Sequence, residues 1–277
     1  MFNLEKKNRI RILLSGYSGR MGKAVQSVVR GSSEFLVTAG VFTGSNGLKT
    51  EKDNIVDERF LYNSFREIQR VEADVIIDFS SKDVLEELLN FALNNKIPLV
   101  IGTTGYSEDQ LKKIKESADV VPIFFSGNMS IGVNVLVRIC KEVVKVLKNS
   151  CDVEILEKHH NKKKDAPSGT ALMIADAISS ALSAGNEKID YIFDRTKNHG
   201  EKKQNEIGIS CIRAGTIVGE HSVIFGLDDE TLTLTHTAVS RKIFAKGALV
   251  AAKFILKKSK GLYFMEDLCN EGLCCLR

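Results

Sequence analysis

The sequence predicts an α/β protein with two parts: a parallel sheet flanked by helices, and an α+β region with an open mixed or antiparallel sheet. The first part is predicted by a buried strand at residues 9–15 that runs directly into a glycine loop and a helix. Strand-like apolar runs then alternate with amphipathic helical segments as far as residue 129, which is typical of a parallel sheet. The second part is predicted by residues 231–238, where threonines alternate with other side chains at the period of two of a strand.

Size and composition limit what kind of protein this is. With 277 residues and 43% hydrophobic residues, the chain fits two ordinary domains with a sizeable core. A net charge of +4 with dispersed lysines gives no reason to expect nucleic acid as a partner. No apolar run reaches signal-peptide length or the ~20 residues of a membrane span, so we expect a cytoplasmic protein without a membrane partner.

The cysteines are expected to be reduced thiols and to bind no metal. All six are scattered through a chain that lacks a secretion signal. The cluster of Cys269, Cys274 and Cys275 contains no CxxC pair and no fourth ligand nearby.

The glycine loop after the first strand reads Gly16-Tyr17-Ser18-Gly19-Arg20-Met21-Gly22. Gly16 permits a tight turn, and Gly22 allows close packing of helix on strand. Gly19 lets backbone N–H groups approach a pyrophosphate at the start of the next helix, expected over 19–30. The spacing is GxxGxxG instead of the commoner GxGxxG, but its context is that of a Rossmann-type dinucleotide-binding domain. The six residues from Gly16 to Met21 are therefore assigned to cofactor binding.

The remaining elements of the first part follow in order. Strands are expected at residues 35–42, 73–79, 99–101 and 120–125, with a short element at 55–61. A helix lies between the strands at 73–79 and 99–101, and a capping box of Ser107 and Gln110 opens another that ends near 118. Small and polar residues follow two of these strands, where ligands lie in open α/β sheets. We assign to the cofactor Gly102, Thr103, Thr104, Ser126, Gly127, Asn128 and Met129.

The cofactor preference depends on the residues after the second strand. An NAD-specific site would offer an acidic residue to the ribose there, about 20 residues after the first glycine. This chain has Thr43-Gly44-Ser45-Asn46 instead, followed by Lys49. These groups can accept a 2′-phosphate without requiring it, so we expect NADPH and/or NADH, with Thr43 as a contact and a tilt toward NADPH.

Residues 157–171 form the predicted active site. Residues 151–156 alternate like a strand, and a helical pattern begins at Ala171, so the stretch between them is a strand-to-helix loop. Asp165 is the expected N-cap of that helix. The backbone N–H groups of Ser168, Gly169 and Thr170 should then point toward an anion.

The side chains of this loop suit a small acid with more than one carboxylate. His159, His160 and Lys163 neutralise carboxylates and can deliver a proton near neutral pH. A zinc site is the weaker alternative, because adjacent histidines project differently and no Cys or acidic partner stands at ligand spacing.

The second part begins with a helix over 130–147, which leaves the nucleotide half at a hinge. Residues 185–205 are expected to wrap the surface, and strands are expected at 207–212, 221–225 and 231–238, with His221 and His236 in structural roles. A helix over 240–257 returns to the first half. The domains are thus 1–129 with 241–277, which binds the dinucleotide, and 130–240, which binds the substrate.

The run from His159 to Ala171 resembles the signature of the 4-hydroxy-tetrahydrodipicolinate reductase family, formerly called dihydrodipicolinate reductase. Blocks at 16–22, 102–105, 126–130 and 213–215 resemble the family's other blocks in the same order, so the resemblance covers nearly the whole chain. It implies NAD(P)H-dependent reduction of 4-hydroxy-tetrahydrodipicolinate to tetrahydrodipicolinate in the diaminopimelate route of lysine biosynthesis. It also implies proton-donor roles for His159 and Lys163, and substrate binding by His160, Gly169 and Thr170.

The resemblance further implies a homotetramer, in which the outer face of the second sheet makes the contact; the alternative is that this face is exposed to solvent. Two other functions remain open. Another two-domain amino-acid dehydrogenase, such as aspartate or homoserine dehydrogenase, shares the architecture but not the run at 159–170. For a non-catalytic nicotinamide-sensing protein, His159 and Lys163 would be dispensable.

Overall fold

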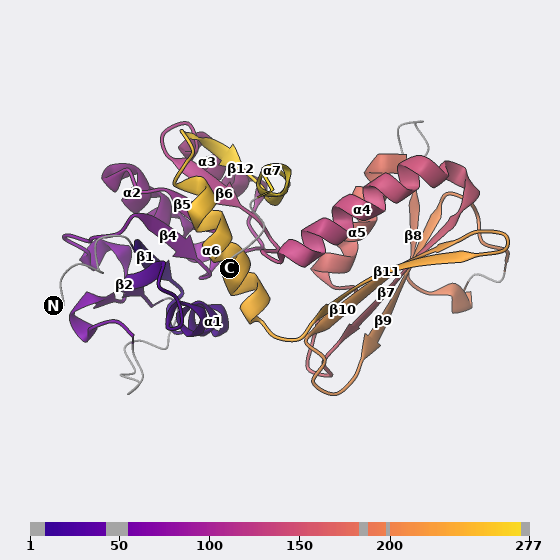
Figure 1. Cartoon of the computed structure of the whole chain (residues 1–277), viewed down its shortest axis with the longest axis horizontal. Helices are drawn as coiled ribbons and strands as arrows, with labels where there is room; N and C mark the ends of the chain where they lie inside the picture. Colours follow the sequence, from indigo (N-terminus) through magenta and orange to yellow (C-terminus); the bar gives the residue numbers. More distant parts are fainter. Residues whose placement is uncertain (1–8, 43–54, 183–187, 198–199, 273–277) are drawn as a thin grey trace. The chain divides into compact units, whose positions relative to one another are not determined.

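The computed structural model describes residues 9–42, 55–182, 188–197 and 200–272, and these residues form two compact units (Figure 1). Unit 1 contains the chain up to Ile131 together with the segment from Arg241 onward, and unit 2 contains Gly132–Ser240. Unit 1 is therefore discontinuous in sequence. Among the described residues, no helix has the length and apolar character that crossing a membrane requires.

Within the described residues, unit 1 contains a seven-stranded sheet in which all neighbouring strands are parallel. In spatial order the strands are β12 (Gly261–Tyr263), β6 (Pro122–Phe125), β5 (Leu99–Ile101), β4 (Val75–Asp78), β1 (Ile10–Ser15), β2 (Phe35–Val41) and β3 (Leu61–Tyr62). The chain builds outward from β1 through β2 and β3 on one side, and from β4 through β6 on the other. The order reverses beside β1, which marks the crevice where open α/β sheets bind ligands.

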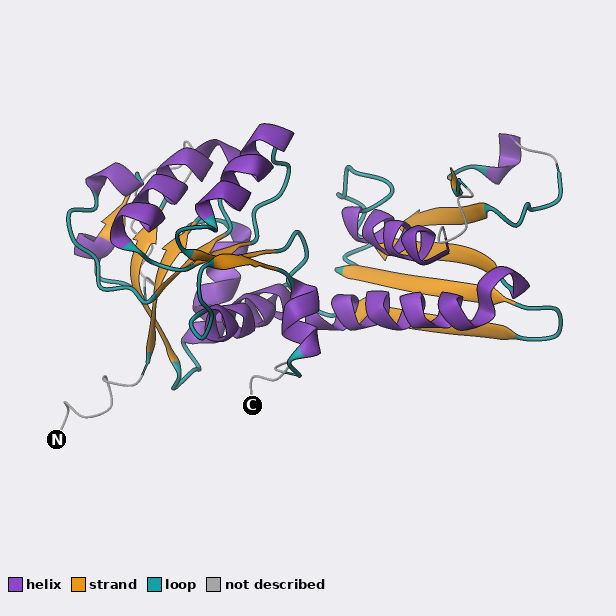
Figure 2. Cartoon of the chain, turned by 90° about the horizontal axis from the view of Figure 1, so that it is seen from above, coloured by secondary structure: helices purple, strands orange, loops and turns teal. Residues whose placement is uncertain are grey.

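Helices cover both faces of this sheet (Figure 2). α1 (Arg20–Val29) and α6 (Lys242–Ile255) pack in one apolar cluster with Ile12 and Leu14 of β1. Leu13 points the opposite way, because side chains alternate along a strand, and packs with α2 (Leu85–Asn95) and α3 (Glu108–Ser117). The predicted capping box is present at the start of α3, and the short helix α7 (Met265–Asn270) follows β12.

Unit 2 contains, as far as the structure describes it, a five-stranded mixed sheet in the order β11-β10-β7-β9-β8. The strands are β7 (Asp152–His159), β8 (Asp190–Ile192), β9 (Glu206–Arg213), β10 (Gly219–Gly226) and β11 (Thr231–Ala238). β9 is parallel to β7 and β8, whereas β10 is antiparallel to both of its neighbours. α4 (Ile131–Leu147) and α5 (Gly169–Leu182) pack on one face and bury an apolar cluster with β7, β9 and β10. The predicted mixed sheet is confirmed.

Two strands were not expected from the sequence. β8 lies in the stretch that we expected to wrap the surface, and β12 follows the last long helix. Each is three residues long, too short to show an alternating pattern, and each pairs at a sheet edge. The described residues also contain short 3-10 turns at Glu58–Phe60, Phe65–Glu67, Lys82–Val84, Lys148–Ser150 and Arg195–Lys197.

Candidate active site

The glycine loop of unit 1 has the predicted geometry of a tight turn. Gly16 has φ +79°, and a Cβ there would lie 2.2 Å from the carbonyl oxygen of Phe79. A Cβ on Gly22 would lie 2.2 Å from the carbonyl oxygen of Gly16, so α1 approaches the loop as closely as a glycine allows. No side chain caps α1 at Gly19, and its first-turn N–H groups suit a phosphate group.

The carboxyl ends of β4 and β5 are joined by a buried carboxylate. Asp78 is fully buried, and its two oxygens accept hydrogen bonds of 2.5 Å from the hydroxyls of Ser80 and Thr103. The Thr103 hydroxyl in turn accepts the backbone N–H of Ser80 at 2.8 Å. Burial raises the pKa of Asp78 above its ordinary value, although the hydroxyl hydrogen bonds oppose that shift. Thr103 is thus occupied within the protein, and it fixes the loop in which Thr104 is exposed.

The loop after β6 lies beside the loop after β5. A Cβ on Gly127 would lie 3.5 Å from the methyl carbon of Thr104. Within this loop the Ser126 hydroxyl donates to the carbonyl of Asn128, and the Asn128 side chain accepts the N–H of Ser130. The three predicted cofactor loops, which follow β1, β5 and β6, therefore lie at the same edge of the unit 1 sheet.

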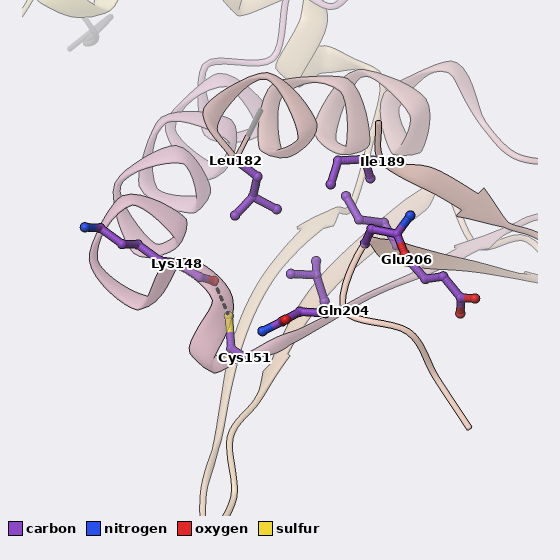
Figure 3. Close-up of a pocket in the computed structure, with 9 residues that line it drawn as sticks. Lys148, Cys151, Leu182, Ile189, Gln204 and Glu206 are labelled. Carbon is purple, nitrogen blue, oxygen red and sulfur yellow. Dashed lines mark hydrogen bonds between the residues drawn. The ribbon is translucent and has the colours of Figure 1, made fainter. Parts of the chain in front are cut away.

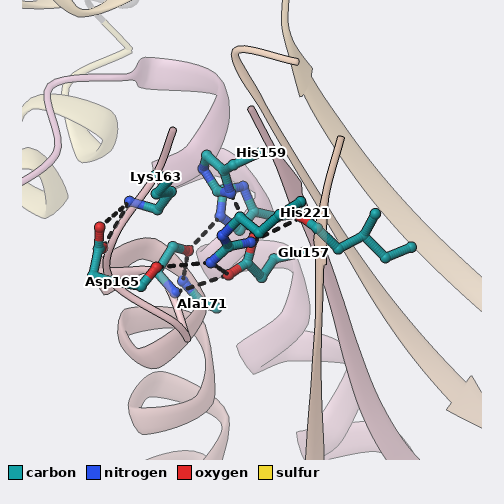
Figure 4. Close-up of polar contacts among 9 residues, drawn as sticks. Glu157, His159, Lys163, Asp165, Ala171 and His221 are labelled. Atoms are coloured by element: carbon teal, nitrogen blue, oxygen red, sulfur yellow. Dashed lines mark hydrogen bonds and ion pairs between the residues drawn. The ribbon is translucent and has the colours of Figure 1, made fainter. Parts of the chain in front are cut away.

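In unit 2, the predicted active-site stretch begins on β7, where every second side chain is buried: Val153, Ile155, Glu157 and His159. The carboxylate of Glu157 thus stands in an otherwise apolar row, with 0% exposure. It receives two hydrogen bonds of 2.7 Å from the guanidinium of Arg213 on β9. The backbone N–H of Ser168 donates to its Oε1 at 3.0 Å, and Nδ1 of His159 lies 2.5 Å from its Oε2 (Figure 4).

These partners keep Glu157 ionised. Burial alone would raise the pKa of Glu157, but hydrogen bonds from Arg213 and His159 outweigh burial and hold the pKa at about 2. A carboxylate at neutral pH accepts hydrogen bonds and donates none. Four donors therefore converge on one buried anion.

His159 and His221 pack against each other at the end of the sheet. Their ring centroids are 5.2 Å apart with an interplanar angle of 74°. Burial first, and then the neighbouring His159, lower the pKa of His221 to about 4, so its ring is neutral at pH 7. Its Nε2 lies 2.9 Å from the Ser168 hydroxyl, which accepts the N–H of Ala171 at 3.1 Å.

Lys163 lies in the loop that follows β7 (Figure 4). Its ammonium contacts both carboxylate oxygens of Asp165 at 2.7 and 2.8 Å, and this hydrogen bonding lowers the pKa of Asp165. Arg213 also donates to the backbone carbonyl of Asp165 at 2.7 Å. Through Arg213, the loop is thus connected to Glu157, the buried carboxylate that also contacts His159.

A small cavity of unit 2 lies at the end of β7 away from His159, where Cys151 and Val153 line it (Figure 3). Its volume of about 30 Å³ is that of a site for one or two water molecules. Cys151 there donates to the backbone carbonyl of Lys148 at 3.9 Å. The cavity is too small for a dicarboxylic acid.

Two family models match the chain: "Dihydrodipicolinate reductase, N-terminus" over residues 10–129, and "Dihydrodipicolinate reductase, C-terminus" over residues 132–269. The chain belongs to the dihydrodipicolinate reductase family. It is 47% identical over 263 residues to the 4-hydroxy-tetrahydrodipicolinate reductase of Caldanaerobacter subterraneus subsp. tengcongensis, over 95% of this chain and 99% of that one. It is 43% identical over 261 residues to the enzyme of the same name from Clostridium novyi, over 93% of this chain and 97% of the relative.

A solved structure shares the fold. The dipicolinate-bound dihydrodipicolinate reductase from Paenisporosarcina sp. TG-14 superposes with a TM-score of 0.75 at 24% identity, over 92% of this chain and 97% of that chain. The predicted family and the predicted α/β fold class are confirmed. Dihydrodipicolinate reductases use NAD(P)H, and the glycine loop and uncapped helix of unit 1 fit that cofactor.

Several predicted site residues have a different place from the one expected. Ser168, and not Asp165, caps α5, because Asp165 is held by Lys163 and Arg213 four residues before the helix begins. The N–H of Ser168 donates to Glu157, so this amide does not point toward a ligand as predicted. Gly169 is exposed at the first position of α5, with nothing within 4 Å of where a Cβ would be.

Two of the residues predicted to bind the cofactor, Tyr17 and Met129, have side chains that are buried in the apolar core of unit 1. Tyr17 is 2% exposed, its ring packs edge-on against Phe42, and its backbone N–H donates to Val41. Met129 is 2% exposed in the same apolar cluster, and a Cβ on Gly247 would lie 1.7 Å from its carbonyl oxygen. Thr43 lies outside the described residues.

Sequence reasoning gave no site role to Glu157 or His221, and used Arg213 only as part of a family block. Glu157 had a detectable signal, because it is an acidic residue in a buried position of an alternating strand. Arg213 and His221 had none, since their contact with Glu157 and Ser168 depends on the pairing of β9 and β10 with β7.

Proposed function

We propose that this chain catalyses the NAD(P)H-dependent reduction of 4-hydroxy-tetrahydrodipicolinate to tetrahydrodipicolinate in the diaminopimelate route of lysine biosynthesis. In this reaction the 4-hydroxyl group leaves as water, and the ring of the dehydrated diacid then takes up a hydride and a proton. The observation that supports the proposal most directly is the cluster of His159, Lys163, Arg213 and the N-terminus of α5 at one end of unit 2. It combines a proton donor with cationic groups for carboxylates.

The residues of unit 2 would divide this work. His159 and Lys163 have the proton-donor roles in this proposal. Lys163 also exchanges its partner Asp165 for a carboxylate of the substrate. His160, Gly169 and Thr170 bind the diacid at the start of α5, where helix N–H groups favour an anion. Ser168 contributes by capping that helix.

The residues of unit 1 would hold the cofactor, which supplies the hydride. The first-turn N–H groups of α1 and the loop from Gly16 through Ser18, Gly19, Arg20 and Met21 bind the pyrophosphate. Thr104, Gly127 and Asn128 contact the nicotinamide half, with Gly102, Thr103 and Ser126 holding their loops in place. Thr43 remains the proposed contact to the 2′ position.

A steady-state assay tests the proposed function. The purified chain should oxidise both NADPH and NADH in the presence of freshly generated 4-hydroxy-tetrahydrodipicolinate, with kcat/KM ratios within about a hundredfold because only neutral groups are proposed to discriminate. Cofactor binding without turnover would favour a nicotinamide-sensing protein. Turnover with an amino acid and NAD(P)⁺, but not with the cyclic diacid, would favour another amino-acid dehydrogenase.

A further inference from the structure

Among the described residues, Glu157 is the most completely buried carboxylate of unit 2, and the proposed reaction gives it no direct contact with substrate. It stands where the pattern of β7 calls for an apolar side chain, between Ile155 and His159 on the same face of the strand. Burying a charge there is costly unless the charge is paired, and the chain supplies Arg213 to pair it. Because a buried charge lowers the stability of the fold unless it is compensated, its presence here indicates a role in the chemistry of the neighbouring His159.

We propose that Glu157 is a positioning residue for His159: its carboxylate holds a proton on Nδ1, so that the doubly protonated ring gives its Nε2 proton to the substrate and becomes the neutral tautomer with its proton on Nδ1. This inference rests on the proposed role of His159 in protonation. The tautomer of a neutral imidazole is set by the hydrogen bond that its other nitrogen makes. Because the ionised carboxylate is only an acceptor, Nδ1 at 2.5 Å from it must be the donor.

The space around Nε2 agrees with this assignment. A Cβ on Gly219 would lie 3.0 Å from Nε2, so only a glycine leaves the surroundings of this nitrogen uncrowded. The backbone carbonyl of His159 accepts the N–H of Ala214 at 2.8 Å, which fixes the strand on which the ring is mounted. The ring is therefore held at Nδ1 and at its backbone, and Nε2 is left for the reaction.

The titratable and charged groups around His159 lie on three strands and in the loop after β7. Glu157 on β7 is the negative charge that contacts the ring, and Arg213 on β9 is the positive charge paired with Glu157. His221 on β10 adds no charge at neutral pH, since its pKa is about 4. In the loop after β7, Lys163 and Asp165 form an ion pair, so their opposite charges lie together. Glu157 is the one anion in direct contact with the ring among the described residues.

The first experiment compares kcat/KM between two variants of buried or paired carboxylates. Glu157→Gln should lower kcat/KM by about tenfold or more, since misplacing the proton of a catalytic histidine is costly. Glu220→Gln is the matched control: Glu220 pairs with Lys158 on the neighbouring strand and does not contact His159. A kcat/KM of Glu157→Gln equal to that of wild type would overturn the inference.

A double-mutant cycle separates positioning from a structural effect. In a His159→Gln background, adding Glu157→Gln should cost less than about twofold, since the residue it positions is already absent. An undiminished cost in that background would mean that Glu157 merely supports the fold. Normal turnover of His159→Gln alone would instead contradict the proposed function.

A spectroscopic measurement on the unaltered protein needs no variant to fold. Nitrogen-15 chemical shifts of the histidine rings, assigned with His159→Gln, should show neutral His159 with its proton on Nδ1. Finding the Nε2-protonated tautomer would refute the inference whatever the kinetics show.

Discussion

Ser168 and Gly169 are neighbours at the start of α5, yet their surroundings differ completely. The N–H of Ser168 donates to Glu157 and its hydroxyl contacts His221, whereas Gly169 is exposed with open space around its Cα. A residue whose polar groups already have partners holds the site together, and one that faces open space can contact a ligand. The same distinction separates Thr103, held by Asp78, from the exposed Thr104.

At the residue scale, we expect His159→Ala and Lys163→Ala each to lower kcat/KM by about 10²-fold or more, the usual effect of losing an acid–base or charge-stabilising group. The dissociation constant of NADPH, measured by fluorescence titration, should stay near that of wild type, because unit 1 carries the cofactor loops. Full turnover by either variant would place the active site elsewhere.

A second residue-scale prediction concerns Gly219. The Cβ of Gly219→Ala would press on Nε2 of His159, so kcat/KM should fall about tenfold or more as the ring is displaced. Gly226→Ala, at the other end of β10, is the matched control, because its Cβ would meet Asp152 at an ordinary 3.8 Å. Equal effects of the two alanines on steady-state rates would show that strand flexibility matters and crowding does not.

At the element scale, α5 is attached to the sheet by buried polar contacts. Glu157 on β7 accepts the backbone N–H of Ser168, the residue just before the helix, and His221 on β10 contacts the capping hydroxyl of Ser168. The apolar stripe of α5 follows from its sequence, and its packing on the sheet was predictable in kind. The residue at which α5 begins was not predictable. Its cap, Ser168, is held by Glu157 and His221, which lie on two different strands and are 11 and 53 residues from Ser168 in the sequence.

This attachment predicts that the stability of unit 2 falls in mild acid. Burial first, and then His159, hold the pKa of His221 at about 4 against an ordinary 6.5, so the unfolded chain binds a proton between these values that the folded chain does not. The stabilisation is complete above about pH 6.5 and is lost as the pH falls toward 4. Glu157, with a pKa of about 2 against an ordinary 4.5, adds a further loss only as the pH falls from 4.5 toward 2.

Between pH 7 and pH 5 the free energy of opening β10, from amide hydrogen exchange, should therefore decrease by on the order of 2 kcal/mol. In His221→Gln this decrease should shrink. It should not vanish, because burial also lowers the pKa of His236 on β11. An unchanged pH dependence in the variant would exclude His221 as its source.

At the scale of the whole molecule, the order of strands and helices in unit 1 was largely predictable, because each βα step carries its own local pattern. The capping box of Ser107 and the turn at Gly16 are examples of features that a few adjacent residues determine. The buried cluster around Glu157 was not predictable, since it is assembled from β7, β9 and β10 by strand pairing. Sequence periodicity shows that such strands exist, but it does not show which side chains meet across them.

The same pairing defines the face through which we propose that four chains assemble. On β11, Leu232 lies opposite Phe225 on the face that α4 and α5 cover, so Thr233, opposite Ile224, points to the other, uncovered face. Both Leu232 and Thr233 are exposed in the single chain. The uncovered face also carries Ile212, which is 42% exposed and would be buried by a second sheet packing there.

Adjacent residues on one strand thus provide a matched pair of variants. Thr233→Arg introduces like charges at a symmetric contact and should reduce the mass found by light scattering from four chains to two or one, since buried unpaired charges are costly. Leu232→Arg, on the opposite face of the same strand, should leave that mass unchanged. If wild type is already a single chain, or if only Leu232→Arg dissociates it, the assembly does not use the uncovered face.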